Sequence, residues 1–167
     1  MNAIYKRRSI RKFTAQPVSE ETLFDFIKAG MNAPSAGNQR PWRFVIITER
    51  SLLDEVPKFH RYAAMLREAP CAILVCGDLE LESLEGMWVQ DCSAATENIL
   101  LEIADQGYGG CWLGIYPREE RIAGIRRLLN LPENIVPLAL IALGHPGEEK
   151  PPKSEFDRSR ISYNRWK

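Results

Sequence analysis

The clearest fold signal in the sequence is the segment Met87–Gln106 (MWVQDCSAATENILLEIADQ). Its apolar residues, among them Ala95, Ile99 and Ile103, recur at helical spacing, and Gly107 follows as a stop signal. The pattern therefore predicts the longest helix of the chain, from about Met87 to Gln106. Its apolar positions spread unusually far around the helix, which indicates that this helix is central to the core or faces a second subunit.

Strands and helices are predicted on the N-terminal side of this segment. Ser19 can cap a helix that ends before Pro34. Runs rich in β-branched and aromatic residues predict buried strands at Trp42–Thr48 and Cys71–Cys76, with a helical stretch between them that ends at Pro70.

The C-terminal side continues the alternation of strands and helices. Gly109–Tyr116 begins as a glycine-rich strand, a helix carrying Ile122 and Ile125 follows, and a last strand is expected at about Val136–Leu143. This mixture predicts an α+β or mixed α/β layered fold. The last 20 residues hold Phe156 and other aromatics without periodicity, and we expect an extended arm pinned onto a surface, such as that of a partner chain.

Length and charge bound the class of protein. The 167 residues fit one domain, and 22 basic residues balance 22 acidic ones, so no net charge steers the chain toward nucleic acid or membrane. Met1–Tyr5 lacks the apolar stretch of a signal peptide, and no run approaches the roughly 18 apolar residues of a membrane span. The expected compartment is the cytoplasm.

Side-chain chemistry points away from a metal site and from a hydrolase. His60 and His145 are the only histidines, and neither is spaced from a cysteine as in zinc fingers. GxSxG, HExxH, a P-loop and GxGxxG after a strand are all absent. A cofactor, rather than a protein side chain, should therefore carry any chemistry. Mostly apolar surroundings predict packing roles for the cysteines, which are Cys71, Cys76, Cys92 and Cys111.

Three segments are candidate binding sites. Ile4–Phe13 (IYKRRSIRKF) is strongly basic, and it fits a solvated surface, a nucleic-acid arm or an anion site in which guanidiniums flank a serine hydroxyl. Pro34–Trp42 (PSAGNQRPW) is either a helix-to-strand connector or a rigid loop that presents Asn38 to a planar heterocycle. In Gly109–Pro117 (GGCWLGIYP), glycines allow close approach of a flat ligand, although a tight strand entry would also use them.

The order of several motifs is similar to that of one known family. RRSxRxF, APSAGNQxPW, WVQDCSAAT, WLGIYP and LGHP…SRISYNRW together resemble the nitroreductase family in its short form, from about Tyr5 to Trp166. The resemblance implies an α+β fold with a central, mostly antiparallel sheet flanked by helices. It also implies a homodimer with exchanged terminal segments and FMN at the subunit interface.

The resemblance further implies an oxidoreductase that takes hydride from NADH or NADPH and reduces a small electrophilic acceptor, such as a nitroaromatic or a quinone, by a ping-pong mechanism. No side chain would act as a catalytic acid or nucleophile. Alternatives left open are a non-catalytic flavin-binding or flavin-delivering protein and a dehalogenating or flavin-consuming relative. Trp42 or Trp88 could wall the substrate pocket, although core packing is the simpler interpretation for both.

The resemblance also assigns site residues. The FMN phosphate and ribityl end would be held by Arg7, Arg8 and Ser9, with closing contacts from Lys153 and Arg160. Arg11 would lie near the pyrimidine edge of the flavin, and Leu113 and Gly114, or the amide after them, near N5. The other subunit would contribute Pro34, Ser35 and Asn38. Two positions depart from the family: Glu155 stands where relatives often have a basic residue, and Arg40 replaces a usual glutamine.

Overall fold

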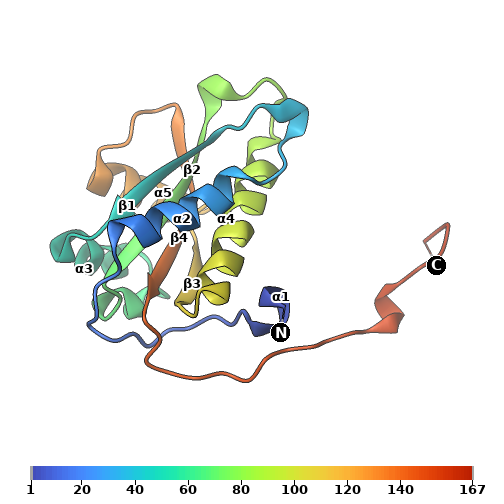
Figure 1. The fold of residues 1–167 in the computed structure, drawn as a ribbon. Coiled ribbons are helices and arrows are strands. Elements are labelled where there is room, and N and C mark those ends of the chain that lie inside the picture. The colour runs from blue at the N-terminus through green and yellow to red at the C-terminus, as the bar shows by residue number, and fades with distance from the viewer. Residues whose placement is uncertain (1, 167) are drawn as a thin grey trace.

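A four-stranded sheet forms the centre of the structure, a computed structural model that describes residues 2–166 (Figure 1). Its strands all pair antiparallel, in the order β1-β2-β4-β3. They are β1 (Trp42–Ile47), β2 (Cys71–Asp78), β3 (Gly109–Gly114) and β4 (Ile135–Gly144). The predicted α+β class with an antiparallel sheet is confirmed, and β1 and β3 are the two edges.

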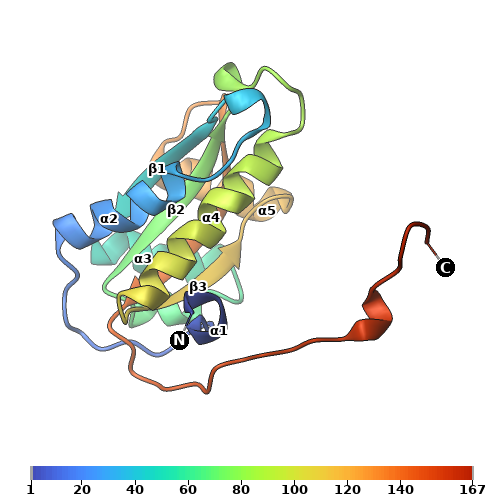
Figure 2. The same cartoon turned by 45° about the vertical axis from the view of Figure 1, so that its right-hand side comes forward.

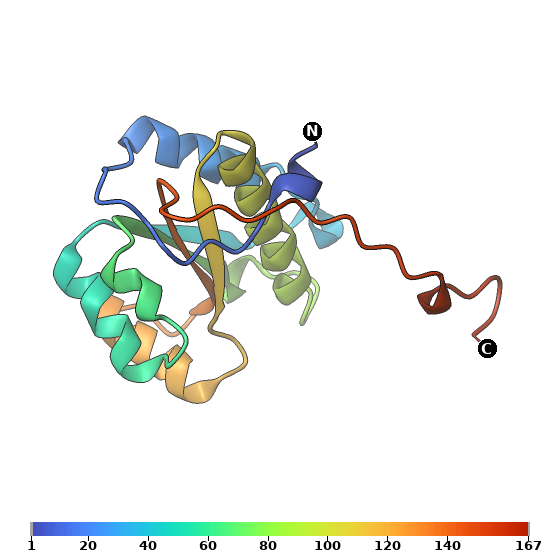
Figure 3. The same ribbon diagram turned by 90° about the horizontal axis from the view of Figure 1, so that it is seen from below.

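Helices cover both faces of the sheet (Figures 1 and 3). On one face lie α2 (Glu20–Met31) and α4 (Trp88–Asp105), and on the other lie α3 (Arg50–Phe59) and α5 (Glu119–Leu129). A short α1 (Ala3–Lys6) packs near α4. No helix within residues 2–166 is both long and apolar enough to cross a membrane.

The central strands read as continuous apolar runs because both of their faces are buried. In β2, Ile73 and Val75 join the core cluster beneath α2 and α4, whereas Leu74 and Cys76 join the cluster beneath α3 and α5. Successive side chains of a strand point to opposite faces, so a single run of apolar residues supplies two cores.

Helix α4 is the longest helix of the described chain, as predicted, and it lies along the sheet beside α2. Gly30 of α2 makes this approach possible, because a Cβ atom there would lie 2.9 Å from the side chain of Ile99. Nearly every residue of α4 is buried or half-buried. The buried face of α4 thus belongs to the core, as one of the two predictions for this helix required, and a face toward a second subunit stays a prediction.

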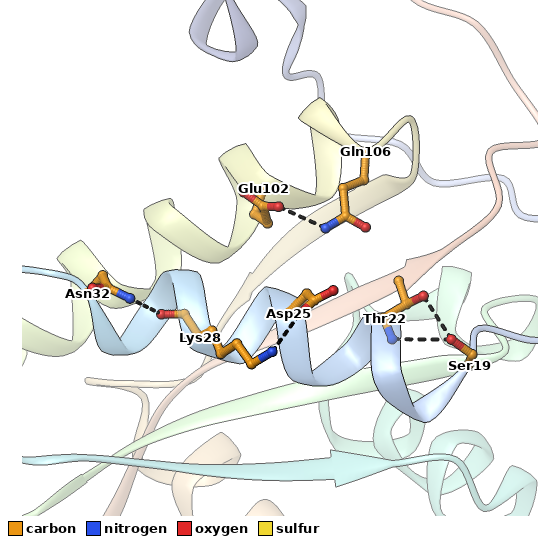
Figure 4. A network of polar contacts seen from close by, with 7 residues as sticks. All are labelled: Ser19, Thr22, Asp25, Lys28, Asn32, Glu102 and Gln106. Atoms are coloured by element: carbon orange, nitrogen blue, oxygen red, sulfur yellow. Dashed lines mark hydrogen bonds and ion pairs between the residues drawn. The ribbon is translucent and has the colours of Figure 1, made fainter.

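Local signals in α2 explain where that helix begins and how its exposed face is held (Figure 4). The hydroxyl of Ser19 accepts the Thr22 N–H at 3.2 Å, which is an N-cap. Along the helix, Lys28 Nζ donates to Asp25 at 2.8 Å, and Asn32 Nδ2 donates to the carbonyl of Lys28 at 2.7 Å. The neighbouring α4 carries a similar pair between Gln106 and Glu102.

The four cysteines pack in the core, and so do Trp42 and Trp88, the two tryptophans that the sequence allowed either in a pocket wall or in the core. All four thiols are buried, which confirms their packing role, and burial raises the pKa of Cys71, Cys76 and Cys92 to about 12. Trp42 and Trp88 are each 6% exposed, so core packing is confirmed for both. Trp88 lies against Gly77, where a Cβ atom would clash with its indole ring.

The two terminal segments run side by side beneath the sheet (Figure 3). Thr14 N–H donates to His145 O at 3.0 Å, and Lys153 N–H donates to Tyr5 O at 3.1 Å. After Lys153 the chain leaves the body as an exposed C-terminal arm, residues 154–166, which contains a single turn, η4 (Arg158–Arg160). The arm is extended, as predicted, but it does not lie on the body of its own chain.

Candidate functional site

Basic side chains of both terminal segments line one depression of about 290 Å³, which we call the basic hollow. Its lining residues are Arg7, Arg8, Ser9, Arg11, Lys150 and Lys153. The predicted N-terminal cluster and Lys153 therefore come together. Lys150 was not predicted to belong to this site.

Hydrogen bonds between the segments fix the shape of the basic hollow. The Arg11 N–H donates to Glu148 Oε1 at 2.6 Å, and Lys150 Nζ donates to Ser9 O at 2.6 Å. The Arg8 guanidinium donates to the carbonyl of Pro151. Because the Arg11 N–H and the Lys150 ammonium both favour the charged form of Glu148, the pKa of that carboxyl is held below its usual value.

Positive charge outweighs negative charge around the hollow. Five cationic side chains line it, and three acidic partners lie at its margin: Arg7 pairs with Glu97 of α4 at 3.4 Å, Lys150 with Glu148 at 3.1 Å, and Lys153 with Glu155 at 2.8 Å. Several N–H donors with net positive charge in a small space suit a phosphate ester.

A rigid turn forms the second candidate segment. It contains the one-turn helix η1 (Ala36–Asn38), and Gly37, Asn38 and Arg40 all have positive φ angles, of 54°, 56° and 48°. The Arg40 N–H donates to Ser35 Oγ at 3.1 Å, and Arg40 Nε donates to Asn38 Oδ1 at 2.8 Å. Arg40 thus holds the side chain of Asn38. The sequence alone did not indicate this contact between the two residues.

Asp91 of α4 anchors this turn from below. Its carboxylate is buried and accepts the Ala36 N–H at 2.9 Å and Gln39 Nε2 at 2.8 Å. The other end of the Gln39 amide accepts the N–H groups of Ser83 and Leu84, each at 3.0 Å. Sequence reasoning missed Asp91, and its only signal was an acid inside the apolar pattern of the long helix.

The third candidate segment is the outer edge of β3, which the N-terminal segment covers at Gly110, where the Ile10 N–H donates to Gly110 O at 3.0 Å. The Gly114 carbonyl accepts Arg121 Nη1 at 2.7 Å and lies 3.1 Å from His60 Nε2, whereas the Ile115 N–H donates inward to Leu138 O at 3.0 Å. Because backbone groups alternate in direction along a strand, the Gly114 N–H points away from β4. Of the residues proposed for this edge, the side chain of Leu113 is buried in the core, and only backbone atoms face outward.

The N-terminal segment that follows α1 and the rigid turn lie near opposite ends of α4 (Figure 2). Asp91, in the first turn of α4, holds the rigid turn, whereas Ala104, in the last turn, lines a small cavity that shares Arg7, Arg8 and Lys150 with the basic hollow. Thirteen residues at 1.5 Å each separate Asp91 from Ala104 by about 20 Å along the helix axis, although Arg7 of the hollow also reaches Glu97, six residues from Asp91. Among residues 2–166, none of Pro34, Ser35 and Asn38 lines the basic hollow.

Arg160 does not reach the hollow either. It belongs to the C-terminal arm, its side chain is 84% exposed, and its Nε atom pairs with Asp157 at 3.0 Å. The basic hollow is closed by the segment between β4 and the arm, without a contribution from Arg160.

Comparisons with known proteins agree with this architecture. The profile of the nitroreductase family matches residues 4–61 and 57–145. A protein of Methanothermobacter thermautotrophicus, provisionally named an NADH dehydrogenase/NAD(P)H nitroreductase, is 45% identical over 99% of this chain and 87% of its own length.

Two solved structures are similar over nearly the whole chain. A provisionally named nitroreductase of Desulfovibrio desulfuricans in complex with FMN is 31% identical, with a TM-score of 0.82 over 99% of this chain and 96% of its own. The NADPH:FMN oxidoreductase of Vibrio harveyi complexed with NAD⁺ is 26% identical, with a TM-score of 0.85 over 99% and 76%. By its family profile and this identity over nearly its full length, the chain belongs to the nitroreductase family.

Proposed function

We propose that this chain works as one FMN-binding domain and is an NAD(P)H-dependent oxidoreductase that reduces a small electrophilic acceptor. The observation that carries the proposal is the basic hollow beside an open strand edge, on a chain of the nitroreductase family. When bound, FMN supplies the redox chemistry, accepting a hydride and passing electrons on. The residues of the chain bind it, orient it and exclude water.

The described residues fit the two ends of this cofactor. The basic hollow suits the phosphate, with Arg7, Arg8, Ser9 and Lys153 as ligands and Arg11 directed to the pyrimidine edge of the ring. At Gly114 a Cβ atom would meet nothing within 4 Å, so a flat ring can approach the backbone there. The outward N–H of Gly114 would donate near N5.

A second subunit would complete the site. Because Pro34, Ser35 and Asn38 do not line the basic hollow of their own chain, we place them against the cofactor of a partner. Each site of the proposed homodimer would then combine a basic hollow from one protomer with a rigid turn from the other. Small-molecule donor and acceptor would use the same pocket in turn, which gives ping-pong kinetics.

The C-terminal arm would exchange between the protomers. Phe156, Tyr163 and Trp166 are 80%, 73% and 92% exposed, an arrangement that is unfavourable in water unless another surface covers these rings. An apolar groove of about 410 Å³ between α2 and β1, where Phe24 and Met31 are exposed, lies beside the free edge of β1. We propose that the arm of a second copy covers this surface.

An absorbance spectrum of the purified protein from about 300 to 550 nm, repeated anaerobically with NADH or NADPH, tests the function. We expect flavin bands that bleach on addition of the donor and return with an added quinone. Flavin that is bound but oxidises NAD(P)H no faster than free flavin would indicate a carrier instead. Failure to bind added FMN would overturn the proposal.

The Arg7→Ala/Arg8→Ala variant should lose the flavin absorbance bands on gel filtration, whereas the control Arg126→Ala, far from the hollow, should retain them.

A further inference from the structure

We propose that Lys150 is a phosphate-binding residue of the basic hollow and supplies the cation that closes it. This inference rests on the proposed function, because the phosphate is that of FMN. It adds a residue that the sequence did not indicate, in the segment 145–153 that follows β4.

Lys150 is held in place more firmly than the other C-terminal cations. Its side chain is 25% exposed, compared with 58% for Lys153 and 84% for Arg160. A side chain that is already ordered loses less conformational entropy when a ligand binds. Partial burial also strengthens the attraction between the ammonium and an anion, because the local dielectric constant is lower than that of water.

The hydrogen bonds of Lys150 leave one donor for a ligand. A lysine ammonium has three N–H donors and no acceptor. One N–H is directed to Ser9 O at 2.6 Å and a second to Glu148 Oε1 at 3.1 Å. The third can therefore donate to a phosphate oxygen in the hollow that Lys150 lines.

The same contacts place the ammonium beside the other proposed phosphate ligands. By holding the carbonyl of Ser9, Lys150 lies next to the loop that carries Arg8 and the Ser9 hydroxyl. Glu148 holds both Lys150 and the Arg11 N–H, so one carboxylate fixes the two chain segments on which these cations lie. A bound phosphate would find this cation in position.

The other C-terminal cations also pair with acids, as Lys150 does with Glu148. Glu155 pairs with Lys153 at 2.8 Å, compared with 3.1 Å between Lys150 and Glu148, and so competes with a phosphate for Lys153. Arg160 pairs with Asp157 in the C-terminal arm. Lys150 therefore supplies positive charge at a site where Glu155 weakens the contribution of Lys153.

The test compares FMN with riboflavin, which has the same ring and no phosphate. Dissociation constants of both flavins are measured by fluorescence titration of flavin-free protein, for the wild type, Lys150→Met, Lys150→Arg and the control Lys58→Met. Lys58 is an exposed lysine of α3 that pairs with Glu55, away from the hollow. Loss of a charged hydrogen bond should raise the Kd for FMN at least about tenfold in Lys150→Met.

The two flavins separate a phosphate contact from a structural role. We expect the Kd for riboflavin to change less than about twofold in Lys150→Met, and Lys150→Arg to recover most of the FMN affinity. A parallel loss of FMN and riboflavin binding would show that Lys150 only supports the Ser9 loop, and would overturn the inference. Unchanged FMN binding would also overturn it. If the wild type itself binds no FMN, the proposed function fails first, and this inference fails with it.

Discussion

The Nε2 atom of His60 lies 3.1 Å from the carbonyl oxygen of Gly114, at the outer edge of β3. Because a carbonyl oxygen only accepts, Nε2 carries a hydrogen and donates. Nδ1 is buried and has no partner among residues 2–166, so the neutral imidazole is the form that fits this environment. Arg121, which donates to the same oxygen, adds a positive charge nearby.

We expect His60 to make the protein less stable as the pH falls below about 6.5. Burial, and secondly the charge of Arg121, lower the pKa of His60 in the folded state. In this pH range the unfolded chain therefore binds a proton that the folded chain does not bind, and the free energy of unfolding decreases on acidification. Urea denaturation of the wild type and His60→Gln between about pH 5 and 7 should show the steeper decrease in the wild type. Equal slopes would mean that His60 does not contribute.

Gly114→Ala should weaken FMN binding without destabilising the fold. A Cβ atom at Gly114 meets nothing within 4 Å in the chain, but it would project from the sheet face beside the edge against which we place the flavin ring. Thermal unfolding of the flavin-free protein should change little, while the Kd for FMN should rise.

Gly109→Ala is the matched comparison for this prediction. A Cβ atom there would lie 2.8 Å from the side chain of Ile10, and such overpacking costs about 1–3 kcal/mol. We therefore expect Gly109→Ala to lower the stability and Gly114→Ala to lower the affinity. If Gly114→Ala binds FMN as tightly as the wild type, the ring does not lie against Gly114.

Asp91→Asn should destabilise the protein by about 1–3 kcal/mol. The carboxylate accepts two donors, from Ala36 and Gln39, and an asparagine amide would turn an N–H group toward one of them. Gln39 cannot simply reverse its amide, because its oxygen already accepts two backbone N–H groups. Chemical denaturation measures this loss.

Asp105→Asn serves as the control on the same helix. Asp105 is an exposed acid in the last turn of α4, so its replacement should change stability by less than about 0.5 kcal/mol. A similar effect of the two substitutions would mean that Asp91 does not anchor the turn.

Glu155→Gln should tighten FMN binding about two- to fivefold at low salt. The substitution frees Lys153 from its pair and removes a negative charge at the margin of the basic hollow. Lys153 lowers the pKa of Glu155, so the carboxylate stays charged at neutral pH and this competition persists. Glu149→Gln, an equal charge change at an exposed neighbour, should have the smaller effect on the Kd. High salt should reduce the difference between them.

A chain that ends at Glu155 should fold but fail to dimerise stably. All of residues 156–166 are exposed in the structure, so their loss removes no buried contact from the body. Sedimentation equilibrium should then show a monomer, and Phe156→Ser in the full chain should shift the equilibrium in the same direction. A stable dimer of the shortened chain would show that the arm is not the main link.

Most of the fold could be predicted from sequence because its signals are local. The helical period of α4, the Ser19 cap and the apolar run of β2 each lie within one segment. Charge density within Ile4–Phe13 likewise marked a candidate anion site, beside the alternatives of a solvated surface and a nucleic-acid arm.

Residues that act across the chain were harder to predict. Lys150 contacts Ser9 over a sequence separation of 141 residues, and Asp91 contacts Ala36 over 55. No periodicity or local motif encodes such pairs, because each side chain by itself looks like an ordinary charge on a loop or helix. The antiparallel pairing that brings the terminal segments together exists only in the folded chain.

The buried thiols have a further consequence for an enzyme whose proposed acceptors include quinones, which alkylate thiolates. A thiol with a pKa of about 12, as at Cys71, Cys76 and Cys92, is a thiolate in only about one molecule in 100,000 at pH 7. Burial also raises the pKa of the remaining thiol, Cys111. The protein would therefore resist alkylation of its cysteines by the proposed electrophilic acceptors. This protection follows from the positions of the sulfur atoms, which the sheet and α4 bury in the core.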